Sequence, residues 1–161
     1  MTTEDFKEVF DRYFDSVRSY IYYRCGDTEL ATDIAQDAFM KIWEKSLPFD
    51  LKQNKGLLYK IAGDLFVSHY RRQKVARRYE NEISLDLACE ETSNLIQYRE
   101  LKSIYEKALS KLPEKQRIVF LMSRQEGLKY IEIAERLDLS VKAVEKRMNL
   151  ALTYLKKAIK V

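Results

Sequence analysis

The chain has 161 residues, of which 46% are hydrophobic and 34% are charged, and its formal net charge is +4. This length and composition are those of a soluble globular protein with one domain or two small ones. Only 4 Gly and 2 Pro interrupt long stretches of helical period, and no segment alternates like a strand, so we expect an all-α fold. The sequence has no secretory leader and no apolar run of membrane length. We therefore expect a cytoplasmic protein without membrane insertion.

Residues suited to metal binding or catalysis are few. His69 is the single histidine of the chain, so a protein zinc site is not expected. Cys25 and Cys89 lie far apart in the sequence and are expected to be free thiols in a cytosolic protein. The sequence also lacks a Gly-rich phosphate loop and an evident nucleophile. We expect no metal, no cofactor and no enzymatic activity.

Charge alternates along the chain in four blocks. Residues 1–46 carry a net charge of −4, residues 47–78 carry +6, residues 79–100 carry −5 and residues 101–161 carry +7. Contact with nucleic-acid phosphates needs local rather than total positive charge. The blocks therefore indicate two nucleic-acid surfaces, one acidic surface for a partner and one acidic spacer.

Three helices are predicted in the first half of the chain. The 3-and-4 spacing of apolar residues over 6–21 predicts a first helix that ends near Gly26. A second helix is predicted over about residues 28–45, and a third from about Lys55 to the basic cluster that ends at Arg78. Together they are expected to form an N-terminal domain of residues 1–78.

The second predicted helix has one apolar face and one acidic face. The apolar face is expected to be buried, and Phe39 and Trp43 are expected in the core rather than in an intermolecular contact. Carboxylates around an exposed methionine make a plausible docking surface for a protein, although an ordinary solvated face is the alternative for any single residue. The candidate docking residues are Asp33, Gln36, Asp37 and Met40.

One side of the third predicted helix is basic. Cations beside aromatic rings suit an opened DNA strand, because bases stack on the rings while phosphates meet the cations. Tyr59, Phe66 and Tyr70 flank the basic side, and for Phe66 a core position is the favoured alternative. A carboxylate repels phosphate, so Asp64 would have to accept a hydrogen bond from a base or cap a neighbouring loop. The candidate DNA contacts of this helix are Lys60, Asp64, Tyr70, Arg71, Lys74 and Arg78.

An acidic stretch and then a second group of helices follow. Residues 79–93 have no clean helical period and are interpreted as a flexible interdomain linker. A helix from about Asn94 to Lys111 and another that starts at Pro113, a residue favourable at the first helical position, open a second domain. This domain is expected to comprise residues 94–161.

The segment 128–152 has the pattern of a helix-turn-helix. Ile131 and Ala134 belong to the side of its first helix that is expected to be packed. Asp138 stands in the turn, where its tolerance of left-handed backbone is an advantage, and Ser140 is a good N-cap for the second helix.

The solvent face of that second helix suits the major groove of DNA. Lysine can donate to guanine, asparagine can pair with adenine and glutamate can accept from cytosine, whereas a merely solvated face is the alternative. The candidate contacts are Lys142, Glu145, Lys146, Arg147 and Asn149, with Arg147 placed on the phosphate backbone.

Two ordered stretches of the sequence resemble one family. The segment ATDIAQDAFMKIWE (31–44), continued by GLLYKIAGDLFVSHYRRQK (56–74), resembles conserved region 2 of the extracytoplasmic-function (ECF) group of bacterial RNA polymerase sigma factors, in the sigma-70 family. The segment LSKLPEKQRIVFLMSRQEGLKYIEIAERLDLSVKAVEKRM (109–148) resembles region 4 of the same group. Asp64, Gly56-Leu57 and Asp138 depart from the residues that are usual in the family.

The resemblance implies a two-domain sigma factor without catalytic activity. Region 2 would bind the clamp helices of core RNA polymerase through the docking residues named above and would melt the −10 element of the promoter. Region 4 would read the −35 element. The implied partners are core RNA polymerase, promoter DNA and an anti-sigma factor. A stand-alone helix-turn-helix regulator is the alternative, but such a protein has no reason to carry the docking helix.

Overall fold

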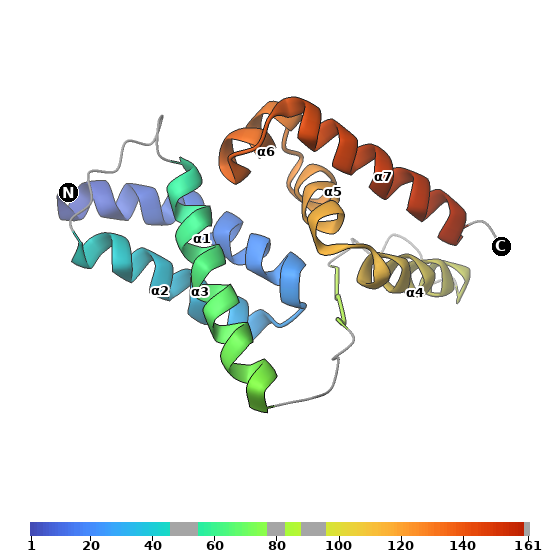
Figure 1. The fold of residues 1–161 in the computed structure, drawn as a ribbon, viewed down its shortest axis with the longest axis horizontal. Coiled ribbons are helices and arrows are strands. Elements are labelled where there is room, and N and C mark those ends of the chain that lie inside the picture. Colours follow the sequence, from blue (N-terminus) through green and yellow to red (C-terminus); the bar gives the residue numbers. More distant parts are fainter. Residues whose placement is uncertain (46–54, 77–82, 88–95, 160–161) are drawn as a thin grey trace.

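A computed structural model of the chain describes residues 1–45, 55–76, 83–87 and 96–159, with the backbone alone at 73–76. In these ranges every regular element is an α-helix, which confirms the expected all-α fold. The helices form two groups that are adjacent in space, α1 to α3 and α4 to α7 (Figure 1).

The first group consists of α1 (Thr3–Cys25), α2 (Thr28–Glu44) and α3 (Lys55–Ala76), which pack on one another. Thr2 begins α1 with a capping box, because its side chain accepts from the Asp5 N–H while the Asp5 carboxylate accepts from the Thr2 N–H. Gly26 ends α1 in the left-handed conformation, with φ 68°. These ends lie close to the positions expected from the sequence.

The interior of this group combines aliphatic and aromatic side chains. The ring of Phe39, on α2, is 1% exposed and lies within 5.2 Å and 5.9 Å of the rings of Phe10 and Phe14 on α1. Phe39 is therefore a core residue, as expected. The ring of Trp43 packs 5.0 Å from that of Phe6, but Trp43 remains 39% exposed and is only partly a core residue.

The second group consists of α4 (Ile96–Lys111), α5 (Glu114–Glu126), α6 (Tyr130–Leu137) and α7 (Val141–Ile159). Helix α7 packs on each of the other three. Pro113 is the N-cap of α5 and not its first helical residue, with φ −52° and ψ 140°. The prediction that α5 starts at Pro113 is thus displaced by one residue.

The helix-turn-helix consists of α6, a short turn and α7. Asp138 has φ 54°, the left-handed conformation anticipated for it, and Ser140 Oγ accepts from the Ala143 N–H at 3.1 Å. Ala134 is buried. The expectation that Ile131 packs inward is wrong, because its side chain is 56% exposed.

A short stretch of the acidic segment packs against α1. Leu85 and Leu87 are both 4% exposed, and Tyr22 Oη accepts from the Asp86 N–H at 2.7 Å and lies 3.1 Å from the Asp86 carbonyl oxygen. Residues 83–87 are therefore packed against the helices, whereas we expected this segment to be part of a flexible linker. The rest of the expected linker lies outside the described residues.

Candidate nucleic-acid and protein interfaces

Helix α2 has one buried face and one exposed, acidic face. Ile34, Ala35 and Ala38 are at most 4% exposed and lie in the core. The four candidate docking residues are all exposed on the other side, namely Asp33, Gln36, Asp37 and Met40. Met40 is 50% exposed, so a large apolar side chain stands in solvent among carboxylates. A partner protein could bury this methionine and meet the carboxylates with cations.

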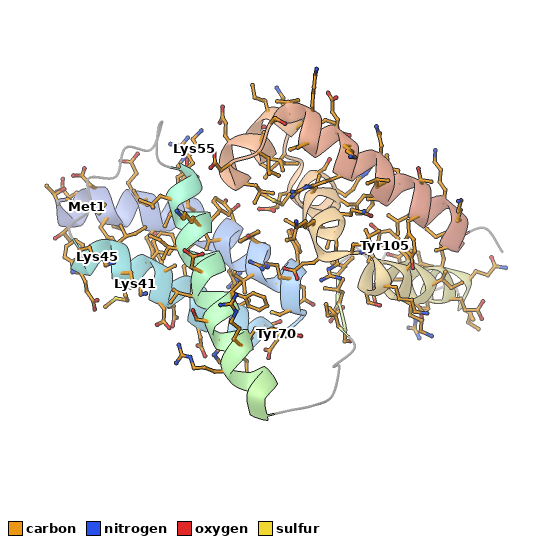
Figure 2. The ribbon with its side chains drawn as sticks, in the orientation of Figure 1. Met1, Lys41, Lys45, Lys55, Tyr70 and Tyr105 are labelled. Carbon is orange, nitrogen blue, oxygen red and sulfur yellow. The ribbon has the colours of Figure 1, made fainter. Side chains whose placement is uncertain are left out.

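The basic side of α3 is exposed over the described part. Lys60, Asp64 and Arg71 are exposed, and Tyr70 is 55% exposed. Figure 2 shows Tyr70 in the C-terminal half of α3 and Lys55 at the other end of that helix, beside α6. Lys74 lies within α3, its side chain outside the described set, and Arg78 lies outside the described residues.

Two aromatic residues of α3 do not offer platforms for bases. Tyr59 is 2% exposed, and burial raises the pKa of its hydroxyl to about 12. The interpretation of Tyr59 as an exposed flanking ring is therefore wrong. Phe66 is 5% exposed, as the core alternative predicted, and its ring stacks at 6.0 Å on that of Tyr70. The buried Phe66 ring therefore packs against the exposed Tyr70 ring and supports it.

Helix α7 presents a polar face opposite its packed one. Val144, Met148 and Ala151 are at most 2% exposed. Exposed on the other side are Lys142, Glu145, Lys146 and Asn149. Side chains of these types on one helix face can reach base edges in the major groove.

Arg147 differs from the other candidates on α7. It is half-buried and lines an open cleft of about 970 Å³ between the two groups of helices. Lys60, from α3, lines the same cleft. One candidate DNA contact from each group therefore faces a shared space.

Arg117, on α5, is a buried charged residue whose structural role the sequence did not reveal. Its side chain is 2% exposed, and its guanidinium donates to the carbonyls of Tyr23 at 2.6 Å, Arg24 at 3.1 Å, Leu112 at 3.0 Å and Ser110 at 3.4 Å. It thereby caps the C-terminal end of α1 from another group of helices. Burial lowers its pKa, but a guanidinium remains charged in proteins.

A second polar contact joins four helices. Ser16 Oγ, on α1, donates to Glu126 Oε1 at 2.8 Å and accepts from Arg136 Nη1 at 2.7 Å. Tyr59 Oη lies 2.7 Å from Ser16 Oγ and accepts from Arg136 Nη1 at 3.1 Å. We refer to Ser16, Tyr59, Glu126 and Arg136 as the interdomain network. Burial raises the pKa of the Glu126 carboxyl, against the opposing effects of Ser16 and Arg136.

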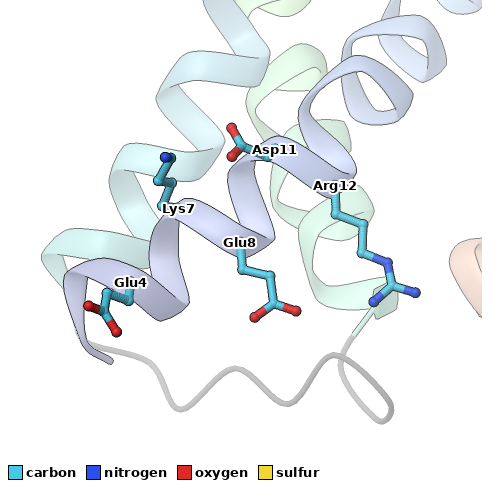
Figure 3. A pocket seen from close by; sticks show the side chains of 5 residues that line it. All are labelled: Glu4, Lys7, Glu8, Asp11 and Arg12. Carbon is cyan, nitrogen blue, oxygen red and sulfur yellow. The ribbon is translucent and has the colours of Figure 1, made fainter.

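Other hollows and clusters offer little chemistry. A shallow hollow of about 520 Å³ follows α1 (Figure 3), lined by Glu4, Lys7, Glu8, Asp11 and Arg12. Among the described residues there is no group of three or more His, Cys, Asp or Glu that could hold a metal ion. Within the same residues no helix is both long and apolar enough to cross a membrane.

Family comparisons match both groups of helices. Residues 9–76 match the family model described as Sigma-70 region 2, and residues 102–155 match that of Sigma-70, region 4. The chain belongs to the sigma-70 family of RNA polymerase sigma factors. The region 2 match distinguishes this sigma factor from a stand-alone helix-turn-helix regulator, because it covers α1 to α3.

Characterised relatives place the sigma factor in the ECF group. The ECF RNA polymerase sigma factor SigW of Bacillus subtilis is 27% identical over 172 aligned positions, which cover 96% of this chain and 89% of that protein. The RNA polymerase sigma factor YlaC of the same organism is 29% identical and covers 96% of this chain and 91% of its own. The ferric citrate uptake sigma factor FecI of Escherichia coli is 24% identical, over 88% of this chain and 83% of its own. The protein is thus a sigma factor that directs promoter-specific transcription initiation.

A solved structure has the same fold. It contains the sigma factor RpoE in complex with the anti-sigma factor NepR from Bartonella quintana, and the sigma factor superposes with a TM-score of 0.71 at 22% identity over 99% of both chains.

Proposed function

We propose that the two groups of helices divide the work of this sigma factor. Residues 1–78 form the region 2 domain, which binds core polymerase and melts the −10 element. Residues 94–161 form the region 4 domain, which reads the −35 element, and residues 79–93 connect the two. This division is carried by the exposed faces of the two groups. Opposite its buried face, each group has an exposed face with the charged, polar or aromatic side chains that its proposed contact needs.

The polymerase contact is assigned to the acidic face of α2. Asp33, Gln36, Asp37 and Met40 are exposed together there. An apolar side chain among charges supplies the desolvated centre and the polar rim of a protein interface. The buried face of the same helix holds α2 against α1 and α3, so that the docking side chains stand on a rigid support.

The −10 contact is assigned to α3. Tyr70 stacks on an unpaired base, and Lys60 and Arg71 meet phosphates, while Asp64 accepts from a base amino group. Lys74 and Arg78, whose side chains lie outside the described set, are assigned to the same contact on the basis of the sequence. The support for this assignment is the exposed Tyr70 ring, held by Phe66 beneath it.

The −35 contact is assigned to α7. Lys142, Glu145, Lys146 and Asn149 approach base edges, and Arg147 approaches the phosphate backbone. The turn at Asp138 and the Ser140 cap fix the angle at which α7 leaves α6.

The sigma factor itself catalyses no reaction and acts in the cytoplasm, where polymerase and chromosome lie. An anti-sigma factor is a further partner that we propose, on the precedent of the complex of the Bartonella quintana protein.

Competition for core polymerase tests the docking face. The double variant Asp33→Ala/Asp37→Ala is expected to displace a reference sigma factor from core polymerase about ten-fold less well, because two charge-assisted contacts are lost. Circular dichroism should show unchanged helical content, since both residues are exposed.

A matched control separates docking from general charge. Asp11→Ala/Asp15→Ala removes two exposed carboxylates from α1 and should compete like the unmodified protein. If the α2 variant also competes normally, the docking face lies elsewhere.

A further inference from the structure

Leu150 is a large apolar side chain on the polar side of α7. It is 47% exposed, whereas Ala151 and Leu155 of the same helix are at most 4% exposed. The apolar core of the described residues includes Leu152 and Tyr154 at its margin, but not Leu150. Leu150 therefore contributes little to the packing that holds α7 against the other helices.

The position of Leu150 places it among the side chains assigned to the −35 element. Successive residues of an α-helix are about 100° apart, so Leu150 lies about 40° from Lys146 around α7 and about one turn further along it. Asn149 lies about 60° from Lys146 in the opposite direction. All three side chains are exposed. Lys146 is thus the centre of a strip that has an amide on one flank and an apolar side chain on the other.

The helix surface next to Leu150 is basic. On an α-helix the nearest surface neighbours of a residue are three and four positions away. Lys146 and Arg147 occupy these positions before Leu150, and Thr153 and Tyr154 occupy them after it. None of the four is a carboxylate. An apolar group beside cations fits a partner that is negatively charged and carries an isolated apolar group of its own.

The major groove of DNA presents one such group. Adenine, guanine and cytosine offer hydrogen-bond donors and acceptors there, and thymine adds a methyl group at C5. A leucine that faces a thymine methyl removes apolar surface from water on both molecules. A leucine that faces another base covers polar groups without pairing them, which costs free energy. Leu150 can therefore both favour thymine and disfavour the other bases.

We propose that Leu150 is a specificity-determining residue of this sigma factor and contacts the C5 methyl group of a thymine in the −35 element. The proposal rests on the assignment of the −35 contact to α7. It adds an apolar contact to the hydrogen bonds that the other exposed residues of α7 are proposed to make. At the base pair that Leu150 faces, the methyl group selects thymine.

Replacement of thymidine by deoxyuridine tests the contact, because uracil lacks only the C5 methyl group. Promoters selected from a library randomised at the −35 element provide the thymines, which are replaced one at a time on either strand. Each modified promoter then competes with its unmodified form for the holoenzyme of core polymerase and the full-length sigma factor. We expect at least one position at which uracil weakens binding about four-fold, the effect of losing one buried methyl group.

Variants of Leu150 assign that effect to its side chain. Leu150→Ala should bind the thymine and uracil promoters equally well, and Leu150→Met, which keeps an apolar side chain of similar size, should retain the preference. The matched control is Leu101→Ala, which truncates a leucine that is 54% exposed on α4. It should retain the full preference, because α4 is not assigned to DNA. Both leucines are exposed, so neither substitution should alter folding.

Two results would overturn the proposal. One is a −35 element in which no uracil replacement weakens binding, and the other is a preference for thymine that Leu150→Ala retains. If Leu150→Ala retains the preference and weakens binding to both promoters alike, Leu150 belongs to a protein contact instead.

Failure of the −35 assignment would look different. In that case Lys142→Ala and Lys146→Ala would leave the preferred −35 sequence unchanged, as would Leu150→Ala. If the lysine variants alter the preferred sequence and Leu150→Ala does not, α7 reads the element and only the role of Leu150 is wrong.

Discussion

The guanidinium of Arg136, on α6, donates a 2.7 Å hydrogen bond to Ser16 Oγ, on α1, across 120 positions of sequence. The same guanidinium donates to Tyr59 Oη, on α3. One residue of the helix-turn-helix is thus tied to two helices of the region 2 domain. These hydrogen bonds join the two groups of helices at the place where α6 packs on α3.

Arg117→Ala should destabilise the protein strongly. The substitution removes the donor to four backbone carbonyls and leaves them buried, which costs about 3 kcal/mol. For a chain of this length the melting temperature should fall by roughly 6–12 °C. Thermal denaturation followed by circular dichroism measures the change.

Lys115→Ala, at an exposed position of the same helix, should change stability by less than about 0.5 kcal/mol. Similar losses in both variants would contradict the capping role of Arg117.

Gly26→Ala should loosen residues 83–87. A Cβ atom at Gly26 would lie 2.5 Å from the Ser84 carbonyl oxygen and 2.9 Å from Ile83 Cγ2, in addition to the strain of a positive φ. Gly127→Ala is the control, because it has a similar φ of 65° and no atom within 4 Å of the added Cβ. Limited proteolysis should cut between residues 79 and 93 faster in Gly26→Ala than in Gly127→Ala. Equal rates would mean that the segment is not held by its contact with α1.

Glu126→Gln should change how stability depends on pH. Burial raises the pKa of this carboxyl above its ordinary value of 4.5, so ionisation destabilises the folded state at neutral pH. That penalty is lost as the pH falls through the raised pKa toward 4.5. The groups that face the carboxyl are Ser16 and Tyr23 of α1, Tyr59 of α3 and Arg136 of α6.

The measurement is urea denaturation of both proteins at several pH values. Gln keeps an acceptor for Ser16 Oγ and carries no charge, so the variant should be at least as stable as the unmodified protein at pH 7. Its advantage should shrink as the pH is lowered toward 4.5. An advantage that stays constant with pH would exclude ionisation of Glu126 as its cause.

Lys146→Ala should alter sequence preference at the −35 element. Loss of one good base contact costs about 1–3 kcal/mol and relaxes preference at one position, whereas loss of a phosphate contact weakens binding to all sequences alike. Initiation from a promoter library randomised at the −35 element distinguishes the two. Arg147→Ala is the companion variant and is expected to give the uniform loss. A uniform loss of initiation for Lys146→Ala would show that Lys146 contacts the phosphate backbone. Unchanged initiation would show that the residues that read the −35 element lie elsewhere.

The sequence alone determined where the helices lie and, for α2 and α7, which face is exposed. Local rules sufficed for the end of α1 near Gly26, the Ser140 N-cap and the left-handed turn at Asp138, because each depends on neighbouring residues only. Periodicity likewise separated the exposed acidic face of α2 from its buried face, since the core of a three-helix group lies on one side of each helix.

Only the tertiary structure decided which side chains are covered by distant helices. Tyr59 flanks a basic face in sequence and is nevertheless buried, because Ser16 and Arg136 arrive from other helices. Arg117 is charged, so its residue type predicts an exposed side chain. It is buried instead, because its guanidinium donates to the Tyr23 and Arg24 carbonyls at the end of α1. A helical period gives the angle at which a side chain leaves its helix. It does not say what lies in that direction, and contacts between residues about 100 positions apart depend on how the two halves dock.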